Sequence, residues 1–462
     1  MATQQSQTQG ARRAARMDPG ARGKVSLGGV LSLLALALPL ALVGCGDSMP
    51  RLSDLNPFAE KEVPLPGKRV AIIQQETLRS DAMAAGRPVA LPPQQANDSW
   101  TQPGGVPSNA PGHLALGSTL RSAWSVSVGT GSSFYGKVTA SPIVYGGQIY
   151  TLDAAGQVTA VSASGGSVVW RASTTPANEK DQEGFGGGLA ADGGRIYAAT
   201  GFGTVVALEA KTGRKLWEKS LGPPLRAAPT ASAERVFAVN KEGQVYCLSG
   251  SDGNELWTFA GTGERASILT DTSPAVDKDL VVVPYPTGDV VALRASSGQP
   301  AWQESLARSA TGSSLGAMSD AGRPVLYGGV MYVAGHGGRM IATSAKTGER
   351  IWSISVASIE QPWVAGDTVF VVDTAGQLAA VTREDGRIRW ASKLGPGTWS
   401  GPVLAGGRLW LASSKGQLVG VDPASGRVAS TDEIGNPVFI GPVVAGNRLY
   451  VLGDNARLYA FQ

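Results

Sequence analysis

One spacing repeats eight times between residues 142 and 462, and it constrains the fold more than any other feature of the sequence. The central position of each copy is held by Gly156, Gly203, Gly243, Gly288, Gly338, Gly376 and Gly416, and by Ala456 in the last copy. Fourteen residues later stand Trp170, Trp217, Trp257, Trp302, Trp352 and Trp390, and then Ser430 in the seventh copy. Fourteen residues earlier stands a proline in every copy but the second, which has Leu189. A fixed period of this kind indicates a repeat architecture.

The residues inside each copy have the pattern of β-structure. Residues 235–239 and 245–248 are apolar runs joined by a turn at Gly243, which is typical of a β-hairpin. A second glycine turn and a short run ending at the tryptophan follow, so each copy supplies four short antiparallel strands. Repeated four-stranded units of about 40–50 residues predict the blades of a β-propeller. The fold class is therefore all-β, with eight blades.

The last copy ends at Gln462, before its tryptophan position. The segment around Trp124, Ser122–Val126, has the composition of the missing strand. We expect this N-terminal strand to complete the last blade and to close the ring, which leaves only short sheet edges.

The repeated tryptophans favour a structural role over a binding role. A large ring at one fixed place in each blade fills the wedge between neighbouring sheets. Four residues after each turn position stands a small residue, and Cys247 occupies this place in the third copy. We therefore interpret Cys247 as a small buried residue and not as a nucleophile.

Residues 1–44 have the features of a lipoprotein signal peptide. Five basic residues precede an apolar run from about Val25 to Val43 that ends in Leu42-Val43-Gly44-Cys45, which matches the bacterial lipobox. Cys45 is then the predicted site of lipid attachment, although the run is also long enough for a transmembrane anchor. Translation can start at Met1 or at Met17. Gly46 after the cysteine favours delivery to the outer membrane, while Asp47 leaves inner-membrane retention open.

Charge and residue usage exclude several classes of function. Residues 1–44 contain five basic residues and one acidic residue, so the rest of the chain has 35 of each and shows no basic patch for nucleic acid. His113 and His336 are the only histidines, and they predict neither a catalytic triad nor a two-histidine metal site. We expect no enzyme activity, no cofactor and no metal.

Three domains follow from this division: a signal peptide at 1–44, a lipidated tether at 45–117 and the propeller at 118–462. The tether is rich in proline, glutamine, alanine and glycine, and we expect deletion of residues 46–110 to leave the fold intact. The repeat frames are constant in length, whereas the connectors between blades vary. The long connectors are 125–141, 171–188, 258–273 and 303–323, and because they emerge on one face, that face is the predicted binding surface.

The repeats, with forms such as Ala207 to Trp217 and Ala342 to Trp352, resemble the pyrroloquinoline-quinone-type propeller repeat. Large quinoprotein dehydrogenases share this repeat, but they carry adjacent cysteines and long insertions that this chain lacks. The lipobox, the tether and the closure resemble the BamB family of outer-membrane lipoproteins. The resemblance implies a monomeric, non-enzymatic scaffold that is lipid-anchored on the periplasmic face of the outer membrane.

The same resemblance implies the partners. They are the periplasmic domains of BamA and other subunits of the machinery that folds and inserts outer-membrane proteins. By this resemblance the contact residues lie in two connectors and are Arg265, Ile268, Leu269, Asp271, Asp320 and Arg323. Asp320 and Arg323 are expected to orient the partner at the rim of the interface. Two alternatives stay open: a quinone-dependent periplasmic dehydrogenase, and a propeller that binds a glycan or a peptide.

Overall fold

The structure is a computed structural model that describes residues 77–117, 119–180, 184–261, 272–306 and 320–462. Residues 75–462 form one compact unit. Its described parts contain strands and turns, and no described segment forms a helix that is long and apolar enough to cross a membrane.

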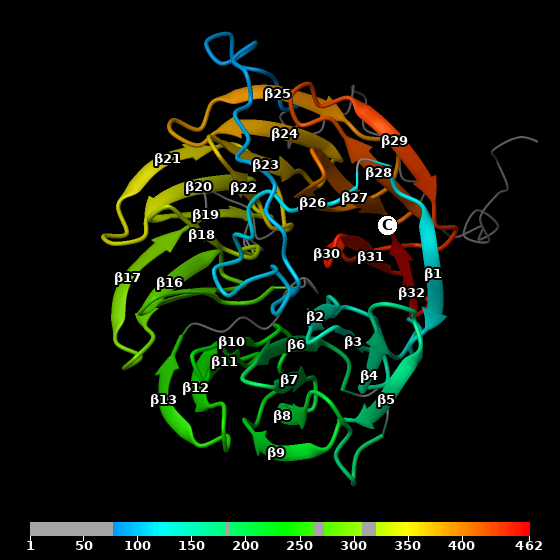
Figure 1. The fold of residues 1–462 in the computed structure, drawn as a ribbon. Helices are drawn as coiled ribbons and strands as arrows, with labels where there is room; N and C mark the ends of the chain where they lie inside the picture. The colour runs from blue at the N-terminus through cyan, green and yellow to red at the C-terminus, as the bar shows by residue number, and fades with distance from the viewer. Residues whose placement is uncertain (1–76, 118, 181–183, 262–271, 307–319) are drawn as a thin grey trace, which may run out of the picture. The chain divides into compact units, whose positions relative to one another are not determined.

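The strands form eight antiparallel sheets of four, arranged as the blades of a ring (Figure 1). Blades one to four are β2 (Ile143–Tyr145), β3 (Gln148–Leu152), β4 (Gln157–Ser162) and β5 (Val168–Ser173); β6 (Gly187–Asp192), β7 (Arg195–Thr200), β8 (Thr204–Glu209) and β9 (Lys215–Ser220); β10 (Thr230–Ser232), β11 (Arg235–Val239), β12 (Gln244–Ser249) and β13 (Glu255–Ala260); and β14 (Ala275–Asp277), β15 (Leu280–Pro284), β16 (Asp289–Arg294) and β17 (Pro300–Ser305).

Blades five to eight are β18 (Val325–Tyr327), β19 (Val330–Gly335), β20 (Arg339–Ser344) and β21 (Arg350–Ile354); β22 (Trp363–Ala365), β23 (Thr368–Val372), β24 (Gln377–Thr382) and β25 (Ile388–Lys393); β26 (Trp399–Ala405), β27 (Arg408–Ser413), β28 (Gln417–Val421) and β29 (Val428–Glu433); and β30 (Val443–Ala445), β31 (Arg448–Leu452), β32 (Arg457–Phe461) and β1 (Ser122–Ser127). The predicted fold class, an eight-bladed propeller, is confirmed.

The ring closes as the sequence predicts. Strand β1 is the outer strand of blade eight and pairs antiparallel with β32, with Trp124 opposite Ala460. The first and last strands of the propeller therefore belong to the same sheet.

Inside each blade, the repeated positions form a row across three strands. In blade one, Tyr150 and Trp170 both lie opposite Ala160, and their ring centroids are 5.7 Å apart. The central residue must be small because the two rings meet beside it. In blade seven the large and small residues are exchanged: Trp410 stands on the second strand and Ser430 on the fourth, both opposite Gly420. A Cβ on Gly420 would come within 3 Å of both the Trp410 ring and the hydroxyl of Ser430. The large inner ring of this blade is thus matched by a small outer residue.

The outer tryptophans also hold neighbouring blades together. Each ring lies against a glycine in the turn between the third and fourth strands of the next blade; these glycines are Gly166, Gly213, Gly253, Gly298, Gly348, Gly386 and Gly426. From Trp170 to Trp390, the indole N–H donates to a backbone carbonyl of the same neighbouring blade at 2.9–3.1 Å. Blade seven faces blade eight, in which β32 ends at Phe461 and the fourth strand comes from β1. Blade eight therefore lacks this turn, which gives a physical reason for Ser430 in place of a tryptophan.

The propeller has two distinct faces at the ends of its inner strands. The chain enters each inner strand from a connector between blades, and we call this side the connector face. It leaves through the turn to the second strand, such as Gly146–Gly147, and we call this side the turn face. The proline before most inner strands lacks an N–H, and those strands start after it. Blade two, which has Leu189, has a six-residue inner strand in place of the usual three.

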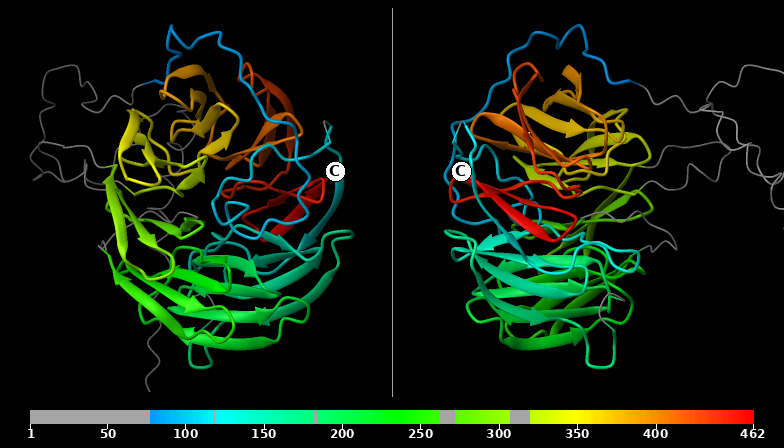
Figure 2. Two further views of the ribbon diagram at one scale, coloured as in Figure 1. Left: turned by 60° about the vertical axis from the view of Figure 1, so that its left-hand side comes forward. Right: turned by 90° about the vertical axis from the view of Figure 1, so that its right-hand side faces the viewer.

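Residues 77–117 differ from the expected tether. Leu78, Ala84, Trp100 and Leu114 are buried, and the segment crosses from the rim near β25 to the centre of the ring on the turn face (Figures 1 and 2). The compact unit accordingly begins near Gln75 and not at residue 118. The structure argues against the expectation that residues 46–110 can be deleted without effect, because the deletion removes buried side chains of the propeller unit.

Candidate functional site: the connector face and the central cavity

Most of the predicted site residues lie outside the described residues. These are the lipid-attachment residue Cys45 and the four connector residues Arg265, Ile268, Leu269 and Asp271. Their assignments stay predictions. The described ends of the two predicted connectors are Thr272–Ser273 and Asp320–Arg323.

Asp320 lies beside blades four and five and is not at an exposed rim. Its side chain is buried, and its backbone carbonyl accepts a hydrogen bond from the N–H of His336 at 3.0 Å. The next two residues are held in the same way, because Ala321 N–H donates to Tyr285 O at 3.2 Å and Gly322 N–H to Ala334 O at 2.8 Å. These backbone bonds draw the end of the connector into the propeller, and the expectation of rim exposure is wrong for Asp320.

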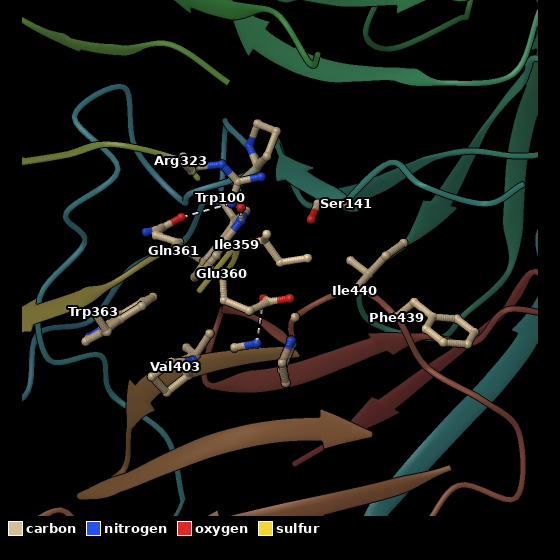
Figure 3. Close-up of a pocket in the computed structure, with 15 residues that line it drawn as sticks. Trp100, Ser141, Arg323, Ile359, Glu360, Gln361, Trp363, Val403, Phe439 and Ile440 are labelled. Atoms are coloured by element: carbon tan, nitrogen blue, oxygen red, sulfur yellow. Dashed lines mark hydrogen bonds between the residues drawn. The ribbon is translucent and has the colours of Figure 1, made fainter. Parts of the chain in front are cut away.

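Arg323 is buried as well, and its side chain is one of those that line the cavity drawn in Figure 3. Its Nε donates to Ser273 Oγ at 3.1 Å and its Nη1 to Gln361 Oε1 at 2.9 Å. The side chain thus connects the beginnings of three neighbouring blades. The expected rim position is wrong for this residue too, because Arg323 is buried and donates hydrogen bonds to Ser273 and Gln361 within the chain.

A cavity of about 90 Å³ lies along the axis of the ring (Figure 3). Trp100 and Pro103 line it together with Phe439 of the connector between blades seven and eight. Glu360 contributes a carboxylate that accepts the N–H of Gly401 at 3.1 Å. A water occupies about 30 Å³ of liquid volume, whereas ligand sites measure about 300–1,000 Å³. The cavity is therefore the size of a small water cluster.

A tricyclic quinone does not fit this centre. The axial cavity is too small, and the buried residues around Trp100 fill the channel on the turn-face side. Within the described ranges, no group of three His, Cys, Asp or Glu side chains is placed to hold a metal ion. Cys247 lies in β12 with no exposed surface, and burial raises the pKa of its thiol to about 12. Its interpretation as a small core residue is confirmed.

The connector face also carries exposed aromatic residues that the sequence did not predict as a site. Phe134 and Tyr135, in the connector before blade one, are 92% and 72% exposed, and Phe439 is 53% exposed. The stretches 128–136, 394–402 and 434–442 contain no charged residue. Beside Phe439, a hollow of about 280 Å³ is lined by Ile359 and Trp399 and also by Glu360 and Asp373. The sequence feature that could have indicated this surface is the presence of aromatic residues in connector stretches without charged residues. An apolar patch of this kind is typical of a protein-binding surface.

Comparison with known proteins gives a consistent result. A family model described as "Outer membrane protein assembly factor BamB" matches residues 114–184, 154–392 and 386–462. The chain is 32% identical over 255 residues to a protein of that description from Vibrio cholerae, which covers 55% of this chain and 65% of the relative. It is 26% identical over 262 residues to an uncharacterized protein of Rickettsia prowazekii, covering 56% of this chain and 63% of the relative. The chain therefore spans slightly less than two thirds of the length of these relatives.

Solved structures of low sequence identity share the fold. The BamB structure from Moraxella catarrhalis has a TM-score of 0.65 and 20% identity, and the match covers 74% of this chain and all of that one. A quinohemoprotein alcohol dehydrogenase from Comamonas testosteroni has a TM-score of 0.62 and 14% identity, covering 79% of this chain and 80% of that chain. The same propeller thus occurs in an assembly factor and in an oxidoreductase, so fold alone does not decide between them.

Proposed function

The chain belongs to the BamB family, and we propose that it is a lipid-anchored, non-enzymatic scaffold of the outer-membrane β-barrel assembly machinery. It is anchored through Cys45 on the periplasmic face of the outer membrane, docks on the periplasmic domains of BamA and aids the folding and insertion of outer-membrane proteins. The family match across the whole propeller is the observation that carries this proposal.

The connector face supports a docking role. Thr272–Ser273 and Asp320–Arg323 lie side by side, since Arg323 donates to Ser273 across blade four. The connectors 258–273 and 303–323 are therefore anchored close together, as a shared interface requires. Arg323 fixes this geometry from inside the fold. In the proposal, Ile268 and Leu269 supply the apolar contact and Arg265 and Asp271 the charges around it.

The alternative of a quinone-dependent dehydrogenase has no support from the centre of the ring. Its cavity of about 90 Å³ lies well below the size of a cofactor site. Addition of pyrroloquinoline quinone and calcium to the purified protein should give neither tight binding nor dye reduction. Tight binding with dye reduction would overturn the proposal.

The docking proposal is tested by capture of BamA periplasmic domains on the purified propeller. The double variant Ile268→Asp, Leu269→Asp should abolish capture and leave the melting temperature unchanged. The matched control, Phe134→Asp with Tyr135→Asp, places the same charges on the connector before blade one and should retain capture. Loss of capture only in the control would move the interface to the aromatic surface and contradict the proposed residues.

A further inference from the structure

The inner strands of the eight blades present unpaired backbone groups to the axis of the ring. Each inner strand pairs with the second strand of its blade on one side only. In an antiparallel ladder alternate residues point their N–H and C=O groups away from the partner strand. In β2 that residue is Val144, the middle residue of three, and equivalent positions occur in the other blades. Such groups need partners, because an unpaired buried backbone group costs free energy.

One segment of the chain forms hydrogen bonds to every blade in a single circuit. In seven of the eight blades a bond reaches a backbone group of the inner strand, and in blade six the segment accepts the indole N–H of Trp363 instead. Residues 97–114 contact the blades in the ring order eight, one, two, three, four, five, six and seven. The hydrogen bonds are Asn97 Nδ2 to Val444 O (2.7 Å), Trp100 N to Val144 O (2.7 Å), Ala191 N to Thr101 O (2.8 Å), Ala231 N to Gln102 Oε1 (3.1 Å), Val276 N to Pro107 O (2.7 Å), Leu326 N to Ser108 O (2.9 Å), Trp363 Nε1 to Gly112 O (2.9 Å) and Leu114 N to Leu404 O (3.1 Å).

Two amide side chains extend this backbone recognition. Gln102 acts like a peptide group toward blade three, since its Nε2 donates to Ala231 O at 2.7 Å while its Oε1 accepts the Ala231 N–H. Asn109 Nδ2 donates to Pro324 O of blade five at 2.9 Å. Both side chains are only 1% exposed. These bonds are formed in a buried site, where the loss of one partner leaves the other unsatisfied.

Apolar packing and close backbone approach complete the fit. Trp100 is 2% exposed and stacks on Trp363 of blade six, with centroids 6.2 Å apart. At Gly104, an added Cβ would lie 2.2 Å from Asn109 Oδ1 and 2.7 Å from Gln361 Oε1. Asn109 belongs to the same segment and Gln361 to the connector before blade six, so a methyl group at Gly104 would displace both amide side chains from the positions in which they form their hydrogen bonds.

The segment is also connected to the connector face. Gln361 Nε2 donates to Asn109 O at 2.7 Å, and Gln361 Oε1 accepts from Arg323. Arg323, a residue expected to contact the partner, thus forms part of the wall that holds Asn109.

We propose that the inner ends of the eight blades form a binding ring for an extended polypeptide, and that residues 97–114 are its built-in ligand. The ligand class is a peptide without secondary structure whose backbone and Asn or Gln amides satisfy the inner strands. The bound segment closes the turn-face end of the channel. It also attaches the anchor-bearing N-terminal region to all eight blades by non-covalent bonds, in addition to its covalent link to β1.

The test is cleavage of the folded full-length chain between the segment and β1. A protease recognition sequence replaces residues 117–119, and the protein is cut after folding, so a folding defect does not obscure the result. The fragment that ends before the cut should co-elute with the propeller in size-exclusion chromatography. Separation of the fragment from a folded propeller would overturn the proposal.

Two variants then locate the binding ring. Gln102→Ala together with Gly104→Ala should raise the dissociation constant of the cut fragment by at least about tenfold, the effect expected when a buried pair of hydrogen bonds is lost. Gly165→Ala is the matched control, because a Cβ there meets nothing within 4 Å. A synthetic peptide of residues 92–117 should rebind to the emptied propeller with one-to-one stoichiometry. Unchanged retention of the double variant would place the attachment on residues 77–94 and overturn the ring as the site.

Discussion

The indole of Trp170 covers Gly213 of the next blade so closely that a Cβ on the glycine would lie 2.5 Å from the ring. Trp170 Nε1 also donates to Ala210 O, three residues before this glycine, at 2.9 Å. The contact recurs around the ring at every blade except blade seven, which has Ser430 at this position and faces a blade without the turn. This explains why tryptophan and glycine recur together in the sequence.

Gly213→Ala should lower the melting temperature and the free energy of unfolding. The new methyl group collides with the indole, and the backbone φ of +73° disfavours a residue with a side chain. We expect a loss of about 2–4 kcal/mol from the two effects together. Chemical denaturation measures it, with Gly165→Ala as the control that should change stability little. Equal stabilities of the two variants would contradict the blade contact.

Trp124→Ala should destabilise the closed ring by about 3 kcal/mol, the lower end for a buried tryptophan, because this side chain is only partly buried. The ring packs against Gly166 of blade one and against Tyr450, with centroids 6.0 Å apart. Thermal unfolding checks the prediction. A change within 0.5 kcal/mol, the range of ordinary surface substitutions, would show that closure does not depend on this side chain.

Trp124→Phe should lower the free energy of unfolding less than Trp257→Phe does. Among the described residues the indole N–H of Trp124 has no hydrogen-bond partner, and the equivalent carbonyl of blade one, Ala163 O, accepts from Arg448. Trp257 Nε1 by contrast donates to Ala295 O at 3.0 Å. Loss of that bond should cost about 1–3 kcal/mol. Parallel urea titrations of the two variants measure the free energy of unfolding. A larger loss of stability for Trp124→Phe would show that the indole N–H of Trp257 does not form the more important hydrogen bond.

Tyr285→Phe and Tyr150→Phe should differ in their effect on stability, and only Tyr150→Phe should destabilise the fold. Within the described residues the buried hydroxyl of Tyr285 has no partner, and burial raises its pKa. Removal of an unsatisfied hydroxyl should be neutral or stabilising by about 1 kcal/mol. Tyr150 Oη donates to Ala210 O at 3.1 Å, so its removal should destabilise by a similar amount. The denaturant midpoints of the two variants are compared with that of the unmodified chain. A lower midpoint for Tyr285→Phe would contradict the prediction.

Asp367→Asn should weaken the attachment of residues 77–94 in a pH-dependent way. Burial alone would raise the pKa of Asp367, but hydrogen bonds from Arg389 and Thr368 and the charge of Arg389 outweigh it, so the pKa lies below its usual 3.8. The carboxylate also accepts the N–H of Ala90 at 3.2 Å. Because the folded-state pKa is lowered, this stabilisation is complete well above pH 3.8 and is lost as the pH falls through the folded value.

The measurement compares melting temperatures of the unmodified chain and Asp367→Asn between pH 6 and pH 3. The difference should be largest at pH 6 and should shrink toward pH 3. A difference that stays constant over this range would show that the ionised carboxylate does not hold the segment.

The sequence by itself determined the eight blades, their closure by β1 and the packing of the tryptophans. These features depend on local patterns, such as a turn glycine at a fixed distance from Trp170, and the pattern recurs in the first six copies and in part in the last two. The tertiary structure alone decided the place of residues 97–114 and the burial of Asp320 and Arg323. Residues 97–114 have the composition of a linker and no period, and the backbone groups that bind them converge only when eight inner strands surround one axis. The buried position of Arg323 likewise depends on Ser273 and Gln361, which belong to different blades and meet only in the closed ring.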